Sequence, residues 1–246
     1  MTKRILPLFI AIIALLGAAG FGISKSGAGD KIRVLIIDGR NNHNWKDTTP
    51  FLKQQLEGTG KFQVSVATTP PNGASAEDWG SFKPDFSKCD VVLSNYNGAK
   101  WEPEPVRKSF EQFLNEGGAL VNVHAANNAH KGWIGFEEAT GLLWRGNKDG
   151  ARLYLDEVGK LLKMEIGKGP GAGHGPQHEY IVQTRDSSHP ITKGIPKEWL
   201  HGKDELYHGQ RGPAKNMNIL ATAFSDSKKG GTGVHEPMIW TIPVGK

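Results

Sequence analysis

Residues 31–38, KIRVLIID, are the feature that most restricts the fold of this chain. A nearly continuous run of β-branched and other apolar side chains is typical of a strand that is buried on both faces. Such strands occur in parallel sheets whose two faces are covered by helices. We therefore expect an α/β fold built around this run.

Strand and helix patterns alternate after this run. The sequence TTPFLKQQLEGTG, residues 48–60, predicts a helix with Thr49 as its N-cap and Pro50 in its first turn. FQVSVAT and DVVLSNY predict two more strands, an apolar face over residues 105–116 predicts a second helix, and ALVNVH predicts a fourth strand. This alternation indicates a mostly parallel sheet flanked by helices.

The pattern changes after Trp144. The sequence then predicts strands that are not separated by long helices, in ARLYLDEVGKLLKMEI, HEYIVQT, NILATAF and PMIWTI. We expect antiparallel strands or long insertions, added to the edge of the parallel sheet. Because no charged or Pro-rich linker divides the halves, residues 31–246 are expected to form one domain.

Residues 1–22 have the pattern of a targeting segment. Two basic residues precede an apolar run from Ile5 to Ala19, and small residues follow, which is the order found in a secretory signal. We expect removal of this segment on export to the periplasm or the extracellular space, with residues 23–30 as a flexible leader. The alternative is an uncleaved membrane anchor, since the run is just long enough to span a bilayer.

The composition argues against some partners and chemistries. The formal net charge is +5, and loss of the two basic residues of the signal would lower it further. No block of Lys and Arg is interleaved with aromatic residues, so nucleic acid is not an expected partner. The single cysteine, Cys89, precludes an internal disulfide, and its place before a predicted strand favours a buried thiol over a nucleophile.

Polar and aromatic side chains follow three of the predicted strands. Ligands bind beyond the carboxyl ends of parallel strands, so we expect these loops to share one edge of the sheet. Amide and imidazole groups can bind sugar hydroxyls, and indole faces can cover the apolar side of a pyranose. For each loop alone, the alternative is ordinary turn chemistry. The predicted substrate-binding residues here are Asn41, His43, Trp45, Asn97 and Trp101.

His124 ends the fourth predicted strand and is a candidate catalytic residue. We expect its imidazole to face the same cavity as that of His43. The alternative is a core histidine whose ring is bonded to backbone groups.

Two histidines of the second half lie in GHGPQHEYIV, residues 173–182, which breaks helical periodicity before a strand. His174 and His178 are candidate ligands of a divalent metal such as zinc, or else partners of substrate hydroxyls. A metal would need a third donor. The candidate third donors are His43, His124, Asp204, Glu205, His208 and His235.

The segment DELY offers two carboxylates, Asp204 and Glu205. In an extended segment they point to opposite faces, so only one is expected to reach the pocket. We favour Glu205 beside His208 as a catalytic acid–base pair. Asp204 is then a substrate-binding candidate, or it caps a turn or pairs with Lys or Arg at the surface. His235 with Glu236 forms a second pair of substrate-binding candidates, the alternative being an ordinary loop.

Four segments together resemble the ThuA-like family, named for trehalose utilisation: GGALVNVHAANNA, GHGPQHEYIVQTRDSSHPITKGIP, WLHGKDELYHGQRGPAKNMNILATAFSD and GTGVHEPMIWT. The resemblance runs from about residue 31 to the last residue. It implies a flavodoxin-like fold of the class I glutamine amidotransferase type and a role in carbohydrate metabolism. Family members continue with a further strand, so the domain is expected either to be truncated at its C-terminus or to lack that strand.

The resemblance also bears on the chemistry. In that superfamily the turn after the fourth strand carries a nucleophilic cysteine, whereas this chain has His124, which argues against glutaminase activity. We expect a secreted carbohydrate-active protein that acts on a sugar or keto-sugar by histidine and carboxylate acid–base chemistry, as a hydrolase or an isomerase, with or without a metal. The alternative is a non-catalytic carbohydrate-binding or accessory module. In both cases the expected partner is a small-molecule carbohydrate.

Overall fold

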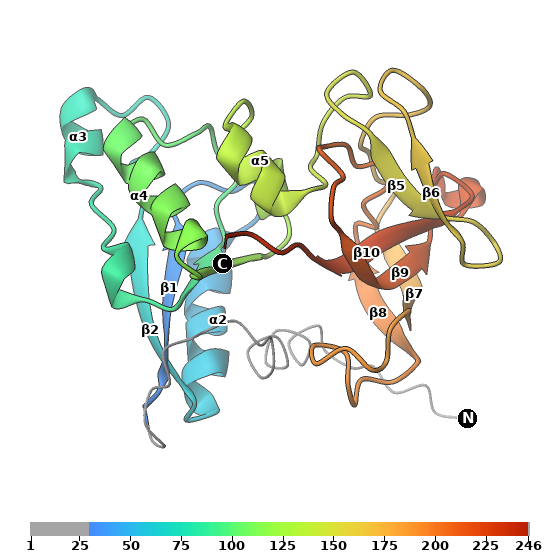
Figure 1. Ribbon diagram of the computed structural model, residues 1–246, viewed down its shortest axis with the longest axis horizontal. Helices are drawn as coiled ribbons and strands as arrows, with labels where there is room; N and C mark the ends of the chain where they lie inside the picture. The colour runs from blue at the N-terminus through green and yellow to red at the C-terminus, as the bar shows by residue number, and fades with distance from the viewer. Residues whose placement is uncertain (1–29, 246) are drawn as a thin grey trace. The chain divides into compact units, whose positions relative to one another are not determined.

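Residues 30–245 are the part of the chain that the computed structural model describes. They divide into two compact units (Figure 1): an N-terminal unit, which runs through Thr140 and includes Val244 and Gly245, and a C-terminal unit, Gly141–Pro243. The predicted signal segment and all but the last residue of the predicted leader lie outside the described residues. Among the described residues, no helix has the length and apolar character needed to cross a membrane. The expectation of one domain over residues 31–246 stays a prediction.

A parallel four-stranded sheet forms the centre of the N-terminal unit, with the strand order β2-β1-β3-β4. Ile36 and Ile37 of the first strand point to opposite faces and are both fully buried, so both faces of the sheet are covered. The predicted parallel sheet is confirmed. Its strands are β1 (Ile32–Asp38), β2 (Phe62–Thr68), β3 (Val91–Ser94) and β4 (Ala119–Asn122).

Helices connect these strands. The α-helices are α2 (Trp45–Gly58), α3 (Ala76–Ser81), α4 (Glu104–Asn115) and α5 (Ile134–Thr140), and the short 3-10 helices are η1 (Phe86–Lys88) and η2 (Ala126–Asn128). The predicted second helix, residues 105–116, corresponds to α4. The sequence patterns did not predict α3 and α5, which are one to two turns long.

The predicted start of the first helix is wrong. Helix α2 begins at Trp45, because the carbonyl of Asn44 accepts hydrogen bonds from the N–H groups of Asp47 and Thr48 at 3.1 and 3.0 Å. Thr49 is therefore not the N-cap but a buried residue inside the helix, and Pro50 lies within the helix rather than in its first turn. The carboxylate of Asp47 in the first turn favours this earlier start, since it complements the positive end of the helix dipole.

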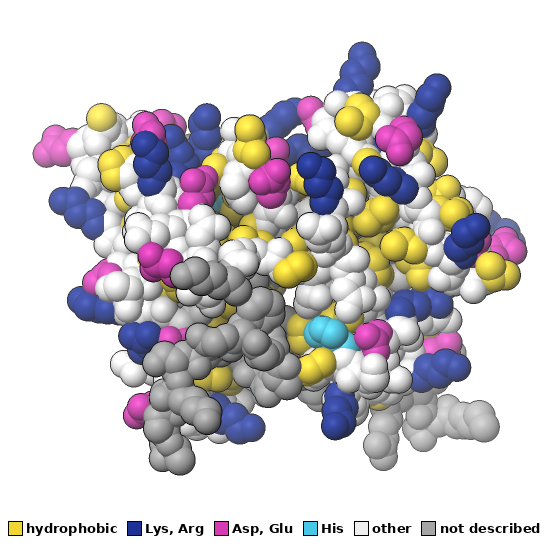
Figure 2. Space-filling view, viewed as in Figure 1, with side chains coloured by type: hydrophobic (Ala, Val, Ile, Leu, Met, Phe, Trp, Pro, Cys, Tyr) yellow, Lys and Arg dark blue, Asp and Glu magenta, His cyan; other side chains and the backbone are white. Residues whose placement is uncertain are grey.

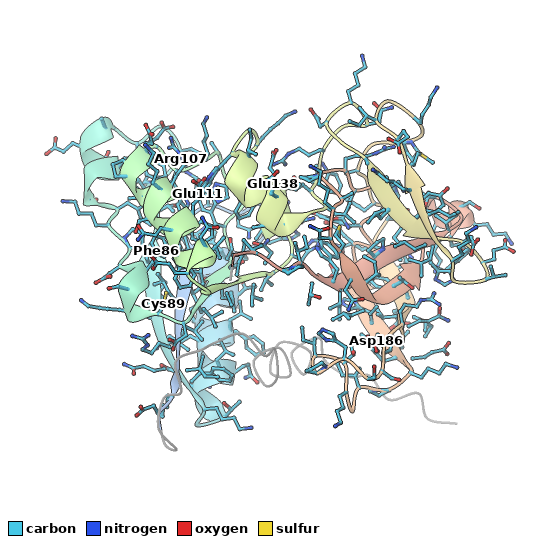
Figure 3. All side chains as sticks on the ribbon, viewed as in Figure 1. Phe86, Cys89, Arg107, Glu111, Glu138 and Asp186 are labelled. Carbon is cyan, nitrogen blue, oxygen red and sulfur yellow. The ribbon has the colours of Figure 1, made fainter. Side chains whose placement is uncertain are left out.

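An aromatic cluster forms much of the core of the N-terminal unit. The ring of Trp101 lies 5.6 Å from that of Phe110 on α4 and 5.3 Å from that of Trp133, measured between centroids. Phe86 and Cys89 lie close together in the same unit (Figure 3), and the thiol of Cys89 is 3.5 Å from the carbonyl oxygen of Phe86. These contacts join the loop after β3, which carries Trp101, to α4 and to the segment after β4 that carries Trp133.

The C-terminal unit is a six-stranded antiparallel sheet with the strand order β6-β5-β10-β9-β7-β8. The predicted antiparallel strands are confirmed, but they form a separate sheet and do not extend the parallel one. This unit also contains the 3-10 helix η3 (Ser227–Lys229). Its strands are β5 (Arg152–Leu155), β6 (Leu161–Met164), β7 (His178–Thr184), β8 (Glu198–Asp204), β9 (Asn218–Phe224) and β10 (His235–Thr241).

Two buried arginines organise the interior of the C-terminal unit. Arg211 is fully buried and donates to backbone carbonyls of the loop after β6, among them that of Pro170 at 3.0 Å. Arg152 forms an ion pair with Glu236, and both side chains are almost completely buried. On the face seen in Figure 2, charged side chains of both signs lie exposed among apolar ones. Arg152 and Arg211 differ from these side chains because they are buried.

Candidate functional site

The loops after β1 and β3 are joined by asparagine side chains. The amide Nδ2 of Asn41 donates to Oδ1 of Asn95 at 3.2 Å, and Asn97 donates to Asn42. Asn95 in turn donates to the hydroxyl groups of Thr48 and Thr49 on α2, each at 3.0 Å. The carboxyl ends of the parallel strands therefore carry a connected set of amides, as the sequence predicted for this edge.

His43 and His124 lie together at this edge of the N-terminal unit. The N–H of His43 donates to Oδ1 of Asn41 at 2.9 Å, and the ring centroids of the two histidines are 4.8 Å apart with 55° between their planes. Strand β4 ends at Asn122, so His124 lies in the turn beyond the strand and not within it. Both side chains are partly exposed, so neither is a fully buried core residue. Their role in binding or catalysis stays a prediction.

The two tryptophans predicted to bind sugar are in different environments. Trp45, at the start of α2, is partly exposed, with the ammonium group of Lys46 5.8 Å from its ring centroid. Trp101 is only 2% exposed and is surrounded by aromatic rings. At this burial the indole of Trp101 is part of the core packing, and a sugar contact for it stays a prediction.

In the C-terminal unit, a histidine and a carboxylate meet beside two aromatic rings. Nε2 of His174, from the loop before β7, lies 3.7 Å from Oε1 of Glu205, which follows β8. Tyr207 stacks on His174 at 6.1 Å between centroids, and Trp144 lies 4.4 Å from Tyr207 and 5.7 Å from His174. We call these four residues the His174 cluster. His174 has about a third of its side-chain surface exposed, so the cluster reaches solvent.

Backbone hydrogen bonds hold the His174 cluster together. Gly173 and His208 exchange two of these bonds, at 3.0 and 2.8 Å, in an isolated antiparallel bridge. This bridge joins the loop that carries His174 to the segment that carries Tyr207. Burial, together with the nearby carboxylates Glu205 and Asp204, raises the pKa of Tyr207, so its hydroxyl stays protonated.

The predicted pairing of Glu205 with His208 is not the one observed. Glu205 meets His174, whereas His208 is 8% exposed and its Nδ1 lies 3.2 Å from the hydroxyl of Ser225. Burial lowers the pKa of His208, as do its neighbours Arg152 and His174, so its ring is neutral near pH 7. The pairing differs because the bridge to Gly173 fixes the backbone of His208.

His174 and His178, the predicted metal ligands, have different neighbours. The ring of His178 contacts Tyr180 on the same strand, at 5.8 Å, and its Nδ1 bonds to the carbonyl of Pro176 at 2.8 Å. Within residues 30–245, no group of three metal-ligating side chains contains either histidine.

Three further candidates in this unit have local or structural partners. Oδ1 of Asp204 accepts the N–H of Glu205 at 2.8 Å, which is the turn-capping alternative. His235 packs against Phe224, with 5.4 Å between ring centroids, and burial lowers its pKa. Glu236 is fully buried and paired with Arg152, which contradicts a substrate contact for Glu236.

Sequence reasoning missed three residues near these groups. Trp144 marked only the end of the alternating strand and helix pattern. Tyr207 is the last residue of the DELY segment and was given no role, and Ser225 lay in no motif. An aromatic residue two positions after a candidate carboxylate was an available signal for Tyr207. Nothing local indicated Ser225, which reaches His208 only through the fold.

Comparisons with known proteins place the chain in a family. The family model described as ThuA, trehalose utilisation, matches residues 33–246. Among curated proteins, none matches the chain. A crystal structure of a putative ThuA-like protein from Parabacteroides merdae is 40% identical, with a TM-score of 0.80, over 87% of this chain and 75% of that one.

A second crystal structure, of a putative ThuA-like protein from Bacteroides uniformis, is 17% identical with a TM-score of 0.55 and supports the fold alone. It covers 91% of this chain and 86% of that one. The predicted flavodoxin-like fold agrees with these neighbours and with the helix-flanked parallel sheet. The chain belongs to the ThuA, or trehalose utilisation, family.

Proposed function

We propose that this protein acts on a sugar or keto-sugar by acid–base chemistry at the His174 cluster. The observation that carries the proposal is the pair of His174 and Glu205 beside the partly exposed indole of Trp144. A proton-transferring pair next to an aromatic face is what a hydroxyl-rich ligand with an apolar ring face requires. Membership of a family described by trehalose utilisation supports the same class of ligand.

The tautomer of His174 supports a role in proton transfer. Its Nδ1 lies 2.7 Å from the carbonyl oxygen of Gly175. A carbonyl only accepts, so Nδ1 carries a hydrogen and Nε2 is the nitrogen that gains or loses a proton. Nε2 is also the nitrogen that faces Glu205. We infer that His174 and Glu205 exchange a proton with the ligand as acid and base, while Tyr207 holds the imidazole plane by stacking.

The asparagine and histidine side chains of the N-terminal unit have a separate part in the proposal. Asn41, Asn97 and His43 offer amide and imidazole groups of the type that bind hydroxyls. We propose that they bind the same class of ligand. The expected phenotype of their loss is weaker binding, in contrast to the loss of proton transfer at the His174 cluster.

Substitutions in the His174 cluster test the proposal. Purified wild type, His174→Gln and Glu205→Gln are assayed on disaccharides and 3-keto sugars, with circular dichroism to confirm folding. His201→Gln is the matched control, because Nδ1 of His201 bonds to the carbonyl of Gly202 at 2.9 Å in the same way. We expect each cluster variant to lose about 10²–10⁴-fold in turnover and the control to keep it.

Two outcomes would contradict the proposal. One is wild-type turnover in His174→Gln, which would remove the acid–base role. The other is sugar binding without turnover in the wild type, which would establish the binding module instead.

We also propose that the protein is exported. The basis is the order of basic, apolar and small residues in positions 1–22. N-terminal sequencing of protein isolated from its native cell should find a first residue near position 20. Recovery of Met1 in a membrane fraction would replace export with anchoring.

A further inference from the structure

The tripeptide Asn-Gly-Ala occurs twice in the N-terminal unit, at residues 72–74 and 97–99. Asparagine before glycine is chemically labile, because glycine has no side chain that would shield its backbone nitrogen. That nitrogen attacks the side-chain amide of the asparagine, and a cyclic imide forms as ammonia leaves. The two tripeptides are identical, so a difference in reactivity between them has to come from the fold.

Asn72 lies at the tip of an exposed turn before α3. Asn72 and Gly73 are both exposed, and within residues 30–245 the side chain of Asn72 has no hydrogen-bond partner. Gly73 has a φ of +77° and open space where a side chain would be. The backbone hydrogen bond across the turn, from the N–H of Ala74 to the carbonyl of Pro71, is long at 3.3 Å. The tip can therefore rearrange at little cost in native contacts.

Arg40 contacts the segments of both tripeptides, but in different ways. Its guanidinium donates to the carbonyls of Pro70 and Pro71, at 3.1 and 2.6 Å, and so holds the residues that precede Asn72. Its own carbonyl accepts the backbone N–H of Asn97 at 2.7 Å. Arg40 thus fixes Asn97 itself, whereas Asn72 lies beyond the anchored part of its turn.

The side chain of Asn97 and the glycine after it are also held. Nδ2 of Asn97 donates to Oδ1 of Asn42, and because Nδ2 is the nitrogen that leaves as ammonia, this bond has to break before the imide forms. The carbonyl of Gly98 accepts the N–H of His130 at 2.9 Å, and a Cβ at Gly98 would collide with the hydroxyl of Tyr96. The backbone at Gly98 therefore has little freedom to move toward the side chain of Asn97.

We propose that Asn72 is a site of spontaneous deamidation in the native protein and that the fold protects Asn97 from the same reaction. The backbone nitrogen of Gly73 forms a bond to Cγ of Asn72, the bond from Cγ to Nδ2 breaks, and ammonia leaves with the displaced proton. Water then opens the imide at either carbonyl, which gives aspartate or isoaspartate. The net change replaces an amide by a carboxylate, so each event lowers the formal net charge of +5 by one unit.

The protection of Asn97 matters for the candidate ligand-binding edge. A carboxylate in place of this amide would no longer donate to Oδ1 of Asn42 and would face it as a second acceptor. The contacts of Asn97 thus keep the edge neutral. The value of this protection for a ligand rests on the proposed function, whereas the difference in reactivity does not.

Peptide mapping of the full-length protein tests the proposal. Trypsin places the two asparagines in separate peptides, residues 62–88 and 89–100, so mass spectrometry follows each conversion by its own gain in mass. In native protein kept at pH 8, we expect Asn72 to react at least about tenfold faster than Asn97, because Asn97 must first lose native hydrogen bonds. In concentrated urea the two rates should be similar, since the local sequence is the same.

A variant tests the source of the protection. Asn42→Ala removes the acceptor of Asn97 and should speed the reaction of Asn97 without changing that of Asn72. Asn44→Ala is the matched control, because this side chain belongs to the same loop and donates to Asp47 at 2.6 Å.

Equal rates at the two positions in the native protein would overturn the proposal. So would an Asn72 that reacts in urea but stays intact in the native protein. An unchanged rate at Asn97 in Asn42→Ala would remove the protective role of that hydrogen bond. The wild-type comparison needs no variant, so it decides the main point even if Asn42→Ala does not fold.

Discussion

Replacement of Glu236 by Gln should strongly destabilise the protein. The side chains of Arg152 and Glu236 have only 3% and 1% of their surface exposed, so the two charges compensate each other out of contact with water. Glu236→Gln keeps the shape and removes the charge, which leaves the guanidinium of Arg152 buried without a counter-ion. Breaking a buried pair from one side costs about 3–5 kcal/mol of unfolding free energy. With a urea dependence of about 1–3 kcal/mol per molar, the midpoint should fall by on the order of 2 M.

Urea unfolding followed by circular dichroism measures this loss, and a double variant supplies the control. Arg152→Met with Glu236→Leu removes both charges and should recover most of the stability, since an apolar pair of similar volume often replaces a buried ion pair without loss. Some deficit should remain, because Arg152 also lies 4.7 Å from the ring centroid of Tyr154. A loss below about 1 kcal/mol in the single variant, or a double variant as unstable as the single one, would refute the reasoning.

Three further predictions concern other groups. Burial lowers the pKa of His208 below its ordinary value of 6.5, so the folded protein binds a proton at this ring less well than the unfolded chain does. The neutral ring therefore contributes to stability above pH 6.5, and this contribution is lost as the pH falls through the pKa of His208 in the folded protein. Urea unfolding between pH 7.5 and about 5.5 should therefore show a shallower loss of stability in His208→Gln than in the wild type, and equal slopes would contradict this. Burial raises the pKa of Cys89 to about 12, so a thiol reagent at pH 8 should label the protein only on unfolding; rapid labelling of the native protein would show an accessible thiolate. His124→Ala should weaken sugar binding, measured by calorimetry, while it changes the unfolding free energy by less than about 1 kcal/mol, and a variant that unfolds would make His124 structural.

Local patterns predicted much of the fold. The β-branched run at residues 31–38 predicts a strand because its side chains are apolar on both faces, and the structure buries both faces of β1. The amphipathic spacing over residues 105–116 predicts α4 to within one residue at each end. The antiparallel strands of the second half were also predictable, since each has its own apolar pattern bounded by turn residues.

The candidate site was only partly predictable from the sequence. Parallel strands place their carboxyl ends at one edge, and from this rule alone the meeting of His43 with His124 could be expected. No such rule paired His174 with Glu205, because they lie in an antiparallel unit whose register depends on hydrogen bonds between distant segments, such as the Gly173–His208 bridge.

The sequence by itself carried the family resemblance, through its motifs, and most of the secondary structure, because periodicity and turn chemistry act between residues that are near in the chain. Burial and pairing were decided only by the tertiary structure. Nothing near Trp101 in the sequence showed that aromatic rings of the core would pack around it, and Glu236 could be read as a ligand contact until Arg152, 84 residues away, was placed beside it. The reason is that the environment of a side chain depends on segments far away in the sequence, and a local pattern holds no information about which of them will arrive there.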